Sequence, residues 1–267
     1  MSLSEHSAKS GSIDTFFERG FEQLKQDYPS IQEIDAASKD FLYRQGDHCT
    51  YVFWIKTGIV KLSHLTAQGT EITIALLRKG DVMGHLQGDS ARHEMEETAQ
   101  ALGEVSYYRL AYSDFKALLS QHAELAWHVF EETYARKQKI ERKLRTILTQ
   151  PVEMRLAETL LELAEMFGIR CTHGYALEIH LTQQDVADLI GASRPVVSTI
   201  LNDFRNRGML DYTRDQICIN DVALSNFCQT KLSLVCWVAN RRRGSAVLLY
   251  GTWFPLGEPP FNTGALT

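Results

Sequence analysis

The sequence predicts an α+β protein in which an antiparallel β-roll, a long helix and a small helical domain with a strand pair follow one another. Three observations support this prediction. Short β-prone runs separated by glycines occupy the first half of the chain, and a long helical pattern follows them. The last third contains two short amphipathic helices joined by a glycine turn. A length of 267 residues is sufficient for such a division into domains.

The composition is that of an ordinary globular protein, with 44% hydrophobic and 23% charged residues. The net charge of -5 argues against a general polyanion binder but leaves open a local basic face. The 5 cysteines include no CxxC pair, which favours a reducing compartment. The polar N-terminus lacks the apolar core of a signal peptide, and no apolar run approaches the roughly 18 residues of a membrane span. We therefore expect a cytoplasmic protein without a membrane partner.

The predicted roll follows a polar N-terminus. Residues 1–12 are expected to be disordered, and Ile13 to Tyr28 has the apolar spacing of a short helix. From Ile31 to Leu110 the strand-like runs are DFLYRQ, YVFWIKTG, IVKLSHL, EITIALL and EVSYYRL. Glycines suited to a positive φ or a tight corner separate these runs: Gly46, Gly58, Gly69, Gly80 and Gly84. This rhythm favours a closed antiparallel roll over a generic β-sandwich, and we place this first domain at residues 13–112.

A long helical pattern runs from Ser113 to about Leu148, with Ser113 and Asp114 as its predicted N-cap. Its predicted apolar seam has the 3-4 spacing of a coiled coil: Ala126, Val129, Thr133, Lys137, Ile140, Leu144 and Ile147. Such a length is unusual for a surface helix of a monomer, so the pattern predicts a dimer helix. A helix packed only on its own domain is the alternative. Gln150-Pro151 marks a hinge, which places the dimerisation segment at residues 113–150.

Two helices are predicted after the proline. The first, VEMRLAETLLELAEMFG, is expected to end with Gly168 as its C′ residue. The second lies in LTQQDVADLIG, where Thr182 and Asp185 form the pattern of a capping box. Gly191 then ends this helix with a tight turn.

A third helix begins directly after that turn. Ser193 is its predicted cap, and its first turn tolerates Pro195 because the missing N–H has no partner there. Helix, glycine turn and helix is the spacing of a helix-turn-helix unit. The segments 208–213 and 216–219 read as the two strands of a winged hairpin after it.

In a helix-turn-helix unit the N-terminal residues of the second helix face the major groove of DNA. The candidates for contacts to bases are Arg194, Pro195, Ser198, Thr199 and Asn202. Arginine donates two hydrogen bonds to guanine, while the hydroxyl, amide or backbone groups of Thr182, Gln183 and Ser193 are candidates for contacts to phosphates. The alternative is a small helical domain without DNA, which the excess of acidic over basic residues between 152 and 230 favours. If the domain binds DNA in spite of this acidic excess, binding depends on Arg194, Arg205, Arg207 and Arg214.

The order of roll, long helix, hinge and winged helix resembles the Crp/Fnr family (cyclic-AMP receptor protein / fumarate-nitrate regulator) of bacterial transcription factors. The resemblance covers about residues 13–230, and it is carried by GDHCTYVFWIKTGIVKL…QGTEITIALLRKGDVMG and LTQQDVADLIGASRPVVSTILNDFRNRGML. It implies a cyclic-nucleotide-binding-like, cupin-like roll that senses an effector, and a long helix that forms a homodimer. It also implies a winged helix, at residues 151–231, that binds a palindromic operator, and surface loops that contact RNA polymerase.

Within this resemblance, Arg194 matches the family's guanine-contacting arginine and Ser193 its phosphate-contacting serine. Pro195 stands where the best-known members have a glutamate. A proline side chain neither donates to nor accepts from a base edge, so we expect no cytosine contact there and an operator that departs from the best-known consensus.

The same comparison gives the effector pocket as Gly84, His85, Leu86, Ile140 and Glu141. Cyclic-AMP-binding members have Gly-Glu-Leu and then an Arg-Ser pair that holds the phosphate. Here Gly84-His85-Leu86 is followed by an acidic stretch at 93–97, and Ile140 and Glu141 replace the Thr-Ser adenine contacts. The resemblance therefore implies no tight cyclic-AMP binding.

An iron–sulfur cluster is also not expected, because Cys49 alone cannot replace the N-terminal cysteine cluster of such members. Haem on His85 and a redox role of Cys49 stay open, so the effector is an unknown small molecule or redox signal.

Residues 232–267 do not fit the family and form an atypical C-terminal extension. Two alternatives to a DNA-binding regulator remain. A cupin-like metal-dependent enzyme would need a His/Glu cassette, but only scattered histidines appear, so neither a metal site nor an enzyme is predicted. A regulatory binding module without DNA would leave the helix-turn-helix pattern unexplained.

Overall fold

A computed structural model describes residues 22–84, 86, 94–177, 179, 181–212 and 217–231, together with the backbone of residues 247–249 and 252–254. The disorder expected at residues 1–12 lies outside these ranges. So does most of the helix expected at Ile13–Tyr28, of which residues 22–27 are helical. The chain forms two compact units, one of Met1–Thr149 with Ile179–Ser193 and the other of Gln150–Glu178 with Arg194–Thr267. The first unit contains the predicted roll, and the second contains the helix that begins with Arg194.

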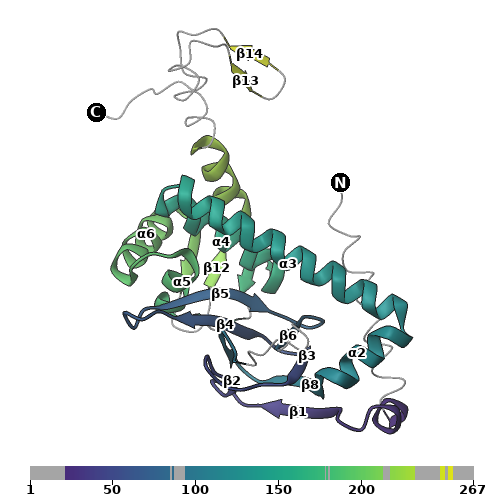
Figure 1. Ribbon diagram of the computed structural model, residues 1–267. Helices are drawn as coiled ribbons and strands as arrows, with labels where there is room; N and C mark the ends of the chain where they lie inside the picture. Colours follow the sequence, from purple (N-terminus) through teal and green to yellow (C-terminus); the bar gives the residue numbers. More distant parts are fainter. Residues whose placement is uncertain are drawn as a thin grey trace. The chain divides into compact units, whose positions relative to one another are not determined.

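The first unit is built on an antiparallel β-roll, which confirms the fold predicted from the glycine-separated runs (Figure 1). Its strands are β1 (Gln32–Ala36), β2 (Phe41–Tyr43), β3 (Tyr51–Thr57), β4 (Val60–Leu65), β5 (Glu71–Leu77), β6 (Val82–Gly84), β7 (Thr98–Ala101) and β8 (Val105–Ala111). They form two four-stranded sheets with the orders β1-β8-β3-β6 and β2-β7-β4-β5. Apart from the β4-β5 hairpin, strands consecutive in sequence lie in different sheets, so the chain winds between the two layers.

The five predicted runs correspond to β2, β3, β4, β5 and β8, whereas β1, β6 and β7 were not predicted. The glycines between the runs have positive φ, as expected. Gly58 shows why the turn between β3 and β4 requires this residue. Its φ is +86°, and a Cβ built on it would lie 2.3 Å from the carbonyl oxygen of Glu104.

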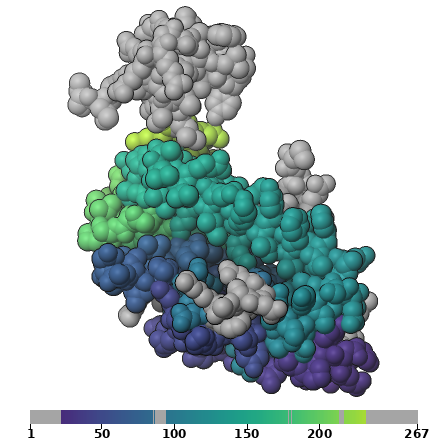
Figure 2. Space-filling view, in the orientation of Figure 1, coloured from purple at the N-terminus to yellow at the C-terminus, as the bar shows by residue number. Residues whose placement is uncertain are grey.

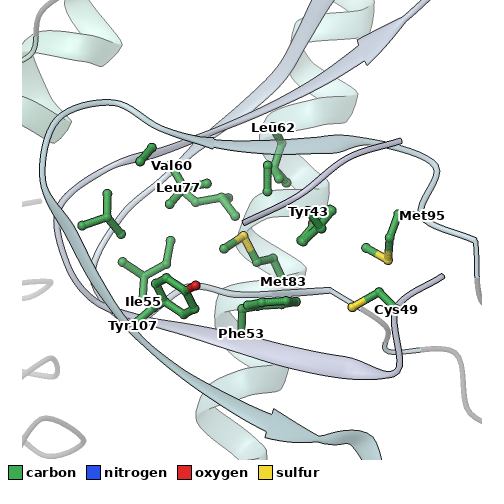
Figure 3. Close-up of a cluster of buried hydrophobic side chains, with 13 residues drawn as sticks. Tyr43, Cys49, Phe53, Ile55, Val60, Leu62, Leu77, Met83, Met95 and Tyr107 are labelled. Carbon is green, nitrogen blue, oxygen red and sulfur yellow. The ribbon is translucent and has the colours of Figure 1, made fainter. Parts of the chain in front are cut away.

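The space between the two sheets of the roll is filled by a first cluster of buried side chains (Figure 3). The ring of Phe53 lies 5.3 Å from that of Tyr43 and 5.8 Å from that of Tyr107, centroid to centroid. Cys49 and Met95 lie at one end of this cluster. Side chains at alternate positions of β3 point the other way, into a second cluster that includes residues of the helices that follow β8. Strand β3 is therefore buried on both faces.

The prediction of one long helix from Ser113 is wrong at its start. Two helices are present, α2 (Tyr112–Gln121) and α3 (Ala123–Thr149), and His122 between them has a non-helical φ of -124° and ψ of 84°. Asp114 does not cap α2, because its carboxylate accepts hydrogen bonds from the backbone N–H and the hydroxyl of Ser30, at 3.2 and 2.6 Å. Apolar side chains of both helices pack into the second cluster, and the break allows both helices to reach it.

The seam predicted along α3 is also wrong at its start, because Val129 is buried in the second cluster of its own unit. The exposed large apolar residues of α3 are Trp127, Phe130, Tyr134, Ile140, Leu144, Ile147 and Leu148. Trp127, Phe130, Tyr134, Leu144 and Leu148 share one 3-4 repeat, and we call them the α3 stripe. The first three rings follow one another at centroid distances of 5.3 and 6.1 Å. Much of the surface of α3 lies open in Figure 2.

Among the described residues, the second unit contains three helices and a four-stranded sheet of order β11-β12-β10-β9. Its elements are α4 (Val152–Phe167), β9 (Gly168–Cys171), β10 (Gly174–Leu177), α6 (Arg194–Asn206), β11 (Leu210–Tyr212) and β12 (Ile217–Ile219), with further helix at residues 221–231. The antiparallel pair β11-β12 confirms the predicted wing. In the C-terminal extension the described backbone forms a hairpin of β13 (Val247–Leu249) and β14 (Thr252–Phe254).

Gly168 does not have the left-handed conformation expected of a C′ residue. Its φ of -92° and ψ of 136° are extended, and it begins β9 directly after α4. A Cβ there would lie 2.4 Å from the carbonyl oxygen of Ala164 and 3.0 Å from Tyr175. The close approach of α4 to the sheet, and not a positive φ, therefore requires glycine at this position.

Candidate nucleic-acid interface

The helix α5 (Gln183–Ile190) has both ends that the sequence predicted. The hydroxyl of Thr182 accepts from the backbone N–H of Asp185 at 3.1 Å, and the Asp185 carboxylate accepts from the Thr182 N–H at 2.9 Å. This reciprocal pair is the expected capping box. Gly191 follows the helix in the left-handed conformation, with φ 63° and ψ 48°. The phosphate candidates Thr182 and Gln183 therefore lie at the positive end of a well-defined helix.

Helix α5 is attached to the roll by a buried ion pair within the first unit. The side chain of Lys61, on β4, is only 6% exposed, and its Nζ lies 3.0 Å from Glu71 Oε1 and 3.3 Å from Asp185 Oδ1. Burial alone lowers the pKa of Lys61, but the two carboxylates outweigh this and the net pKa is raised. Lys61 therefore stays charged, and it joins the N-terminal turn of α5 to the sheet.

Helix α6 is amphipathic, and its first turn carries the candidate base contacts. Val197, Leu201 and Phe204 are buried, and the exposed residues of the helix include Arg194, Pro195, Thr199, Asn202 and Asn206. The first turn contains no acidic residue. Arg194 has neither a hydrogen bond nor an ion pair with any residue that the structure describes. Its guanidinium is therefore available to a ligand outside the protein.

The other arginines near α6 are engaged within the second unit. Arg205 Nε lies 3.2 Å from Asp211 Oδ1 of the wing, and Arg207 lies 3.2 Å from Asp203 Oδ2 one turn earlier. Arg214, the remaining candidate, lies outside the described residues. Two acidic residues of the region, Asp211 and Asp203, thus pair with these arginines. Neither forms an ion pair with Arg194.

Two hydrogen bonds orient other candidate side chains of α6. The hydroxyl of Tyr212, on β11, donates to Asn202 Oδ1 at 2.9 Å. The hydroxyl of Thr199 donates to the carbonyl oxygen of Pro195 at 3.0 Å. Ser193 is exposed and directly precedes the helix, and Ser198 is partly exposed. The predicted candidates from 193 to 202 therefore lie along one helix, with Asn202 tied to the wing.

The candidate effector residues of the roll lie at the end of β6. Gly84 has φ +99°, and a Cβ there would lie 2.6 Å from the carbonyl oxygen of Tyr51. Leu86 packs against the second cluster. His85, the haem candidate, lies outside the described residues. Burial raises the pKa of the Cys49 thiol, which lowers the thiolate fraction at neutral pH.

The two effector candidates on α3 are exposed. Ile140 is 40% exposed, and Glu141 forms an ion pair with Lys137. Contact between α3 and β6 is made one turn earlier, where the Arg136 guanidinium donates to the carbonyl oxygen of Val82 at 2.8 Å. Ile140 and Glu141 are therefore not brought against Gly84 by any described contact.

In the part of the chain that the structure describes, no three His, Cys, Asp or Glu side chains are arranged to hold a metal ion. No helix among these residues is long and apolar enough to cross a membrane.

A β-roll that continues into a long helix, followed by a helix-turn-helix with a wing and an available arginine, defines a class of two-domain DNA-binding regulators. Comparison with protein families agrees with this class. Residues 33–122 match a family described as cyclic nucleotide-binding domain, and residues 154–224 match one described as Crp-like helix-turn-helix domain. The chain belongs to the Crp/Fnr family of transcription regulators, which are not enzymes.

Individual relatives and solved structures support this assignment. The chain is 30% identical over 199 residues to the global nitrogen regulator of Synechocystis sp., covering 74% of this chain and 88% of the relative. It is 26% identical over 176 residues to the cAMP-activated global transcriptional regulator Vfr of Pseudomonas aeruginosa, covering 65% and 82%. A CooA mutant from Carboxydothermus hydrogenoformans shares the fold, with a TM-score of 0.64 and 22% identity over 78% of this chain and 90% of that one.

Some residues of the site were not found from the sequence. Lys61 lies in a run that reads as an ordinary strand, and its partner Asp185 is 124 positions away. Tyr212 was predicted only as part of a strand, although its hydroxyl orients Asn202. Arg136 was not singled out in the sequence, although its guanidinium contacts Val82. Local periodicity does not reveal these contacts, because each contact joins two different elements of the chain.

Proposed function

We propose that this chain is a homodimeric regulator that binds a palindromic DNA operator through the first turn of α6. A signal other than cyclic AMP, received by the roll, controls this binding. Residues 13–112 form the sensing domain, residues 113–150 the dimerisation segment and residues 151–231 the DNA-binding domain. The observation that carries the proposal is Arg194, which is exposed at the start of α6 and has no partner among the described residues. A guanidinium in this state can donate two hydrogen bonds to guanine O6 and N7.

The contacts to DNA divide into two groups. Arg194, Pro195, Ser198, Thr199 and Asn202 face the base edges, whereas Thr182, Gln183 and Ser193 contact phosphates and fix the position of the protein on the duplex. Because a dimer has two-fold symmetry, the operator contains two inverted half-sites about one helical turn apart.

The α3 stripe supports the homodimer. Phe130 is 56% exposed, Leu144 57% and Leu148 74%, which is unfavourable for side chains of this size on a solvated helix. The 3-4 spacing of the stripe is that of two helices packed side by side. A second copy of the chain would bury it.

The roll supports a signal other than cyclic AMP. Glu94, Glu96 and Glu97 stand where a phosphate anion needs cations, and the hydroxyl of Tyr43 already donates to Glu97 at 3.0 Å. The first cluster fills the space between the sheets with the protein's own side chains (Figure 3). Relatives named for nitrogen regulation and for activation by cAMP resemble the chain to a similar degree, so their names do not select a signal.

The test is selection of bound duplexes from a random DNA pool at fixed salt concentration. It is carried out with the protein alone, and again with cyclic nucleotides, haem and cell extract added. The expected result is enrichment of a two-fold-symmetric motif. Arg194→Ala should abolish enrichment and keep the fold and the dimer, because the side chain is exposed and has no hydrogen bond or ion pair with a described residue. Arg78→Ala, which removes the same charge from an exposed position on the roll, is the matched control.

Two outcomes would contradict the proposal. Retention of the motif by Arg194→Ala would place recognition elsewhere in the chain. Absence of an enriched motif under every condition would favour a regulatory module that does not bind DNA.

A further inference from the structure

The surface that α6 presents beside Arg194 is apolar. Pro195 and Thr199 are both exposed and lie four residues apart, so they share one face of the helix. Val196, next to Pro195, is 43% exposed, although its neighbour Val197 is fully buried. When the helix enters the major groove, exposed carbon atoms in its first two turns lose contact with water. They are then best placed against a carbon atom of the DNA.

The polar group of Thr199 is already engaged within the helix. Its hydroxyl donates to the carbonyl oxygen of Pro195 at 3.0 Å, so the hydroxyl hydrogen is not available to a base. The methyl group is the other branch on the same Cβ and makes no such bond. Pro195 has neither a donor nor an acceptor in its side chain. Pro195 therefore offers only carbon atoms to the DNA, and Thr199 offers its methyl group and no hydrogen-bond donor.

The major groove contains one apolar group, the C5 methyl of thymine. At the same edge of a base pair, cytosine presents an N4 donor in place of this methyl group, and Pro195 has no acceptor to offer it. We propose that Pro195 and the methyl group of Thr199 recognise the methyl group of a thymine in the base pair beside the guanine bound by Arg194. This inference rests on the proposed function, and it adds a specificity determinant to it.

The test removes one methyl group from the DNA. Each thymine of the half-site in the enriched duplex is replaced in turn by deoxyuracil, which keeps the base-pairing and hydrogen-bonding edges and lacks only the C5 methyl. At the base pair beside the guanine, we expect the Kd to rise about fourfold per half-site, or about fifteenfold when both half-sites are changed, from the free energy of burying one such carbon. Deoxyuracil outside the half-sites is the control and should leave the Kd unchanged.

The protein side is tested by Thr199→Ser, which removes the methyl group and keeps the hydroxyl that bonds to Pro195. This variant should lose affinity for the thymine duplex and show little further loss when thymine is replaced by deoxyuracil. Thr230→Ser, which removes the same methyl group from an exposed threonine whose hydroxyl donates to the carbonyl oxygen of Asn226 at 2.9 Å, should keep the full dependence on the thymine methyl. A Thr199→Ser variant that loses the same factor on both duplexes would overturn the inference.

The outcomes separate this inference from the proposed function. An enriched motif without thymine in the half-site, or binding that depends on Arg194 and does not change with deoxyuracil, overturns the thymine contact alone. Absence of any enriched motif overturns the proposed function and the thymine contact together. Enrichment of thymine beside guanine, with a Kd that rises when its methyl group is removed, supports both.

Discussion

Replacing Lys61 by methionine tests how α5 is attached to the roll. The substitution keeps an unbranched side chain in the buried space and removes the charge that faces Glu71 at 3.0 Å and Asp185 at 3.3 Å. Removing one partner of a buried ion pair costs about 3–5 kcal/mol. Here the cost is reduced, because the Glu71 side chain is 41% exposed and regains water, and Asp185 keeps its bonds to Thr182. We expect the free energy of unfolding to fall by about 2–3 kcal/mol.

Urea unfolding followed by circular dichroism measures this change. The matched control is Lys56→Met on strand β3 of the other sheet, where the lysine pairs with Glu33 and is 33% exposed. A pair at this level of exposure contributes about 0–1 kcal/mol. If Lys61→Met lowers the free energy of unfolding no more than Lys56→Met does, the buried ion pair of Lys61 contributes no more to stability than an exposed one.

The same variant has an expected pH dependence. The pKa of Asp188 is raised, mainly by burial. The hydrogen bond from Gln184 and the charge of Lys61 lower it, whereas the charges of Glu71 and Asp185 raise it. Without Lys61 the folded-state pKa rises more, so the folded form binds a proton more tightly than the unfolded form and stability decreases as pH rises through that pKa. The stability difference between wild type and Lys61→Met should therefore become smaller as the pH falls from neutral towards the range in which carboxylates protonate. A difference independent of pH would contradict this assignment.

Two further predictions concern the dimer and the turns of the roll. Leu144→Lys should shift the protein to monomers in sedimentation velocity. The dimer Kd should rise at least about 100-fold, because two leucines leave the interface and two charges enter it. Leu65→Lys, at a position on β4 that is 55% exposed, should leave the dimer intact. Gly58→Ala should cost at least about 3 kcal/mol in urea unfolding, because its φ is positive and its Cβ would meet a backbone oxygen at 2.3 Å. Gly46→Ala has a similar φ and nothing within 4 Å, and should cost only about 1–2 kcal/mol. Equal costs for the two glycines, or a monomer produced by Leu65→Lys, would refute the respective argument.

The parts of the fold that the sequence predicts are those fixed by local chemistry. Strands such as β3 and β5 are rich in β-branched and aromatic residues and are bounded by glycines that require positive φ. The ends of α5 are set by Thr182, Asp185 and Gly191, all within one or two residues of the helix. In each case the residue that determines the structure lies inside the segment it determines.

The parts that the sequence does not predict depend on distant partners. His122 is neither proline nor glycine, and the break there is explained by the packing of α2 and α3 on the same cluster. Along α3 two apolar stripes have a 3-4 spacing, and only the roll decides that Val129 belongs to the interior and Leu144 to the exposed side. Periodicity identifies such a helix, but the choice of face is a tertiary property.

Asp185 combines both kinds of information. Its place three residues after Thr182 predicts the capping box, and the same carboxylate also accepts a charge-assisted hydrogen bond from Lys61 on β4. The residue that shapes the N-terminal turn of α5 is therefore also the residue that attaches this turn to the roll. Lys61 thus links β4, and through Glu71 also β5, to the end of α5 that carries Thr182 and Gln183, by a contact that no local pattern in either segment reveals.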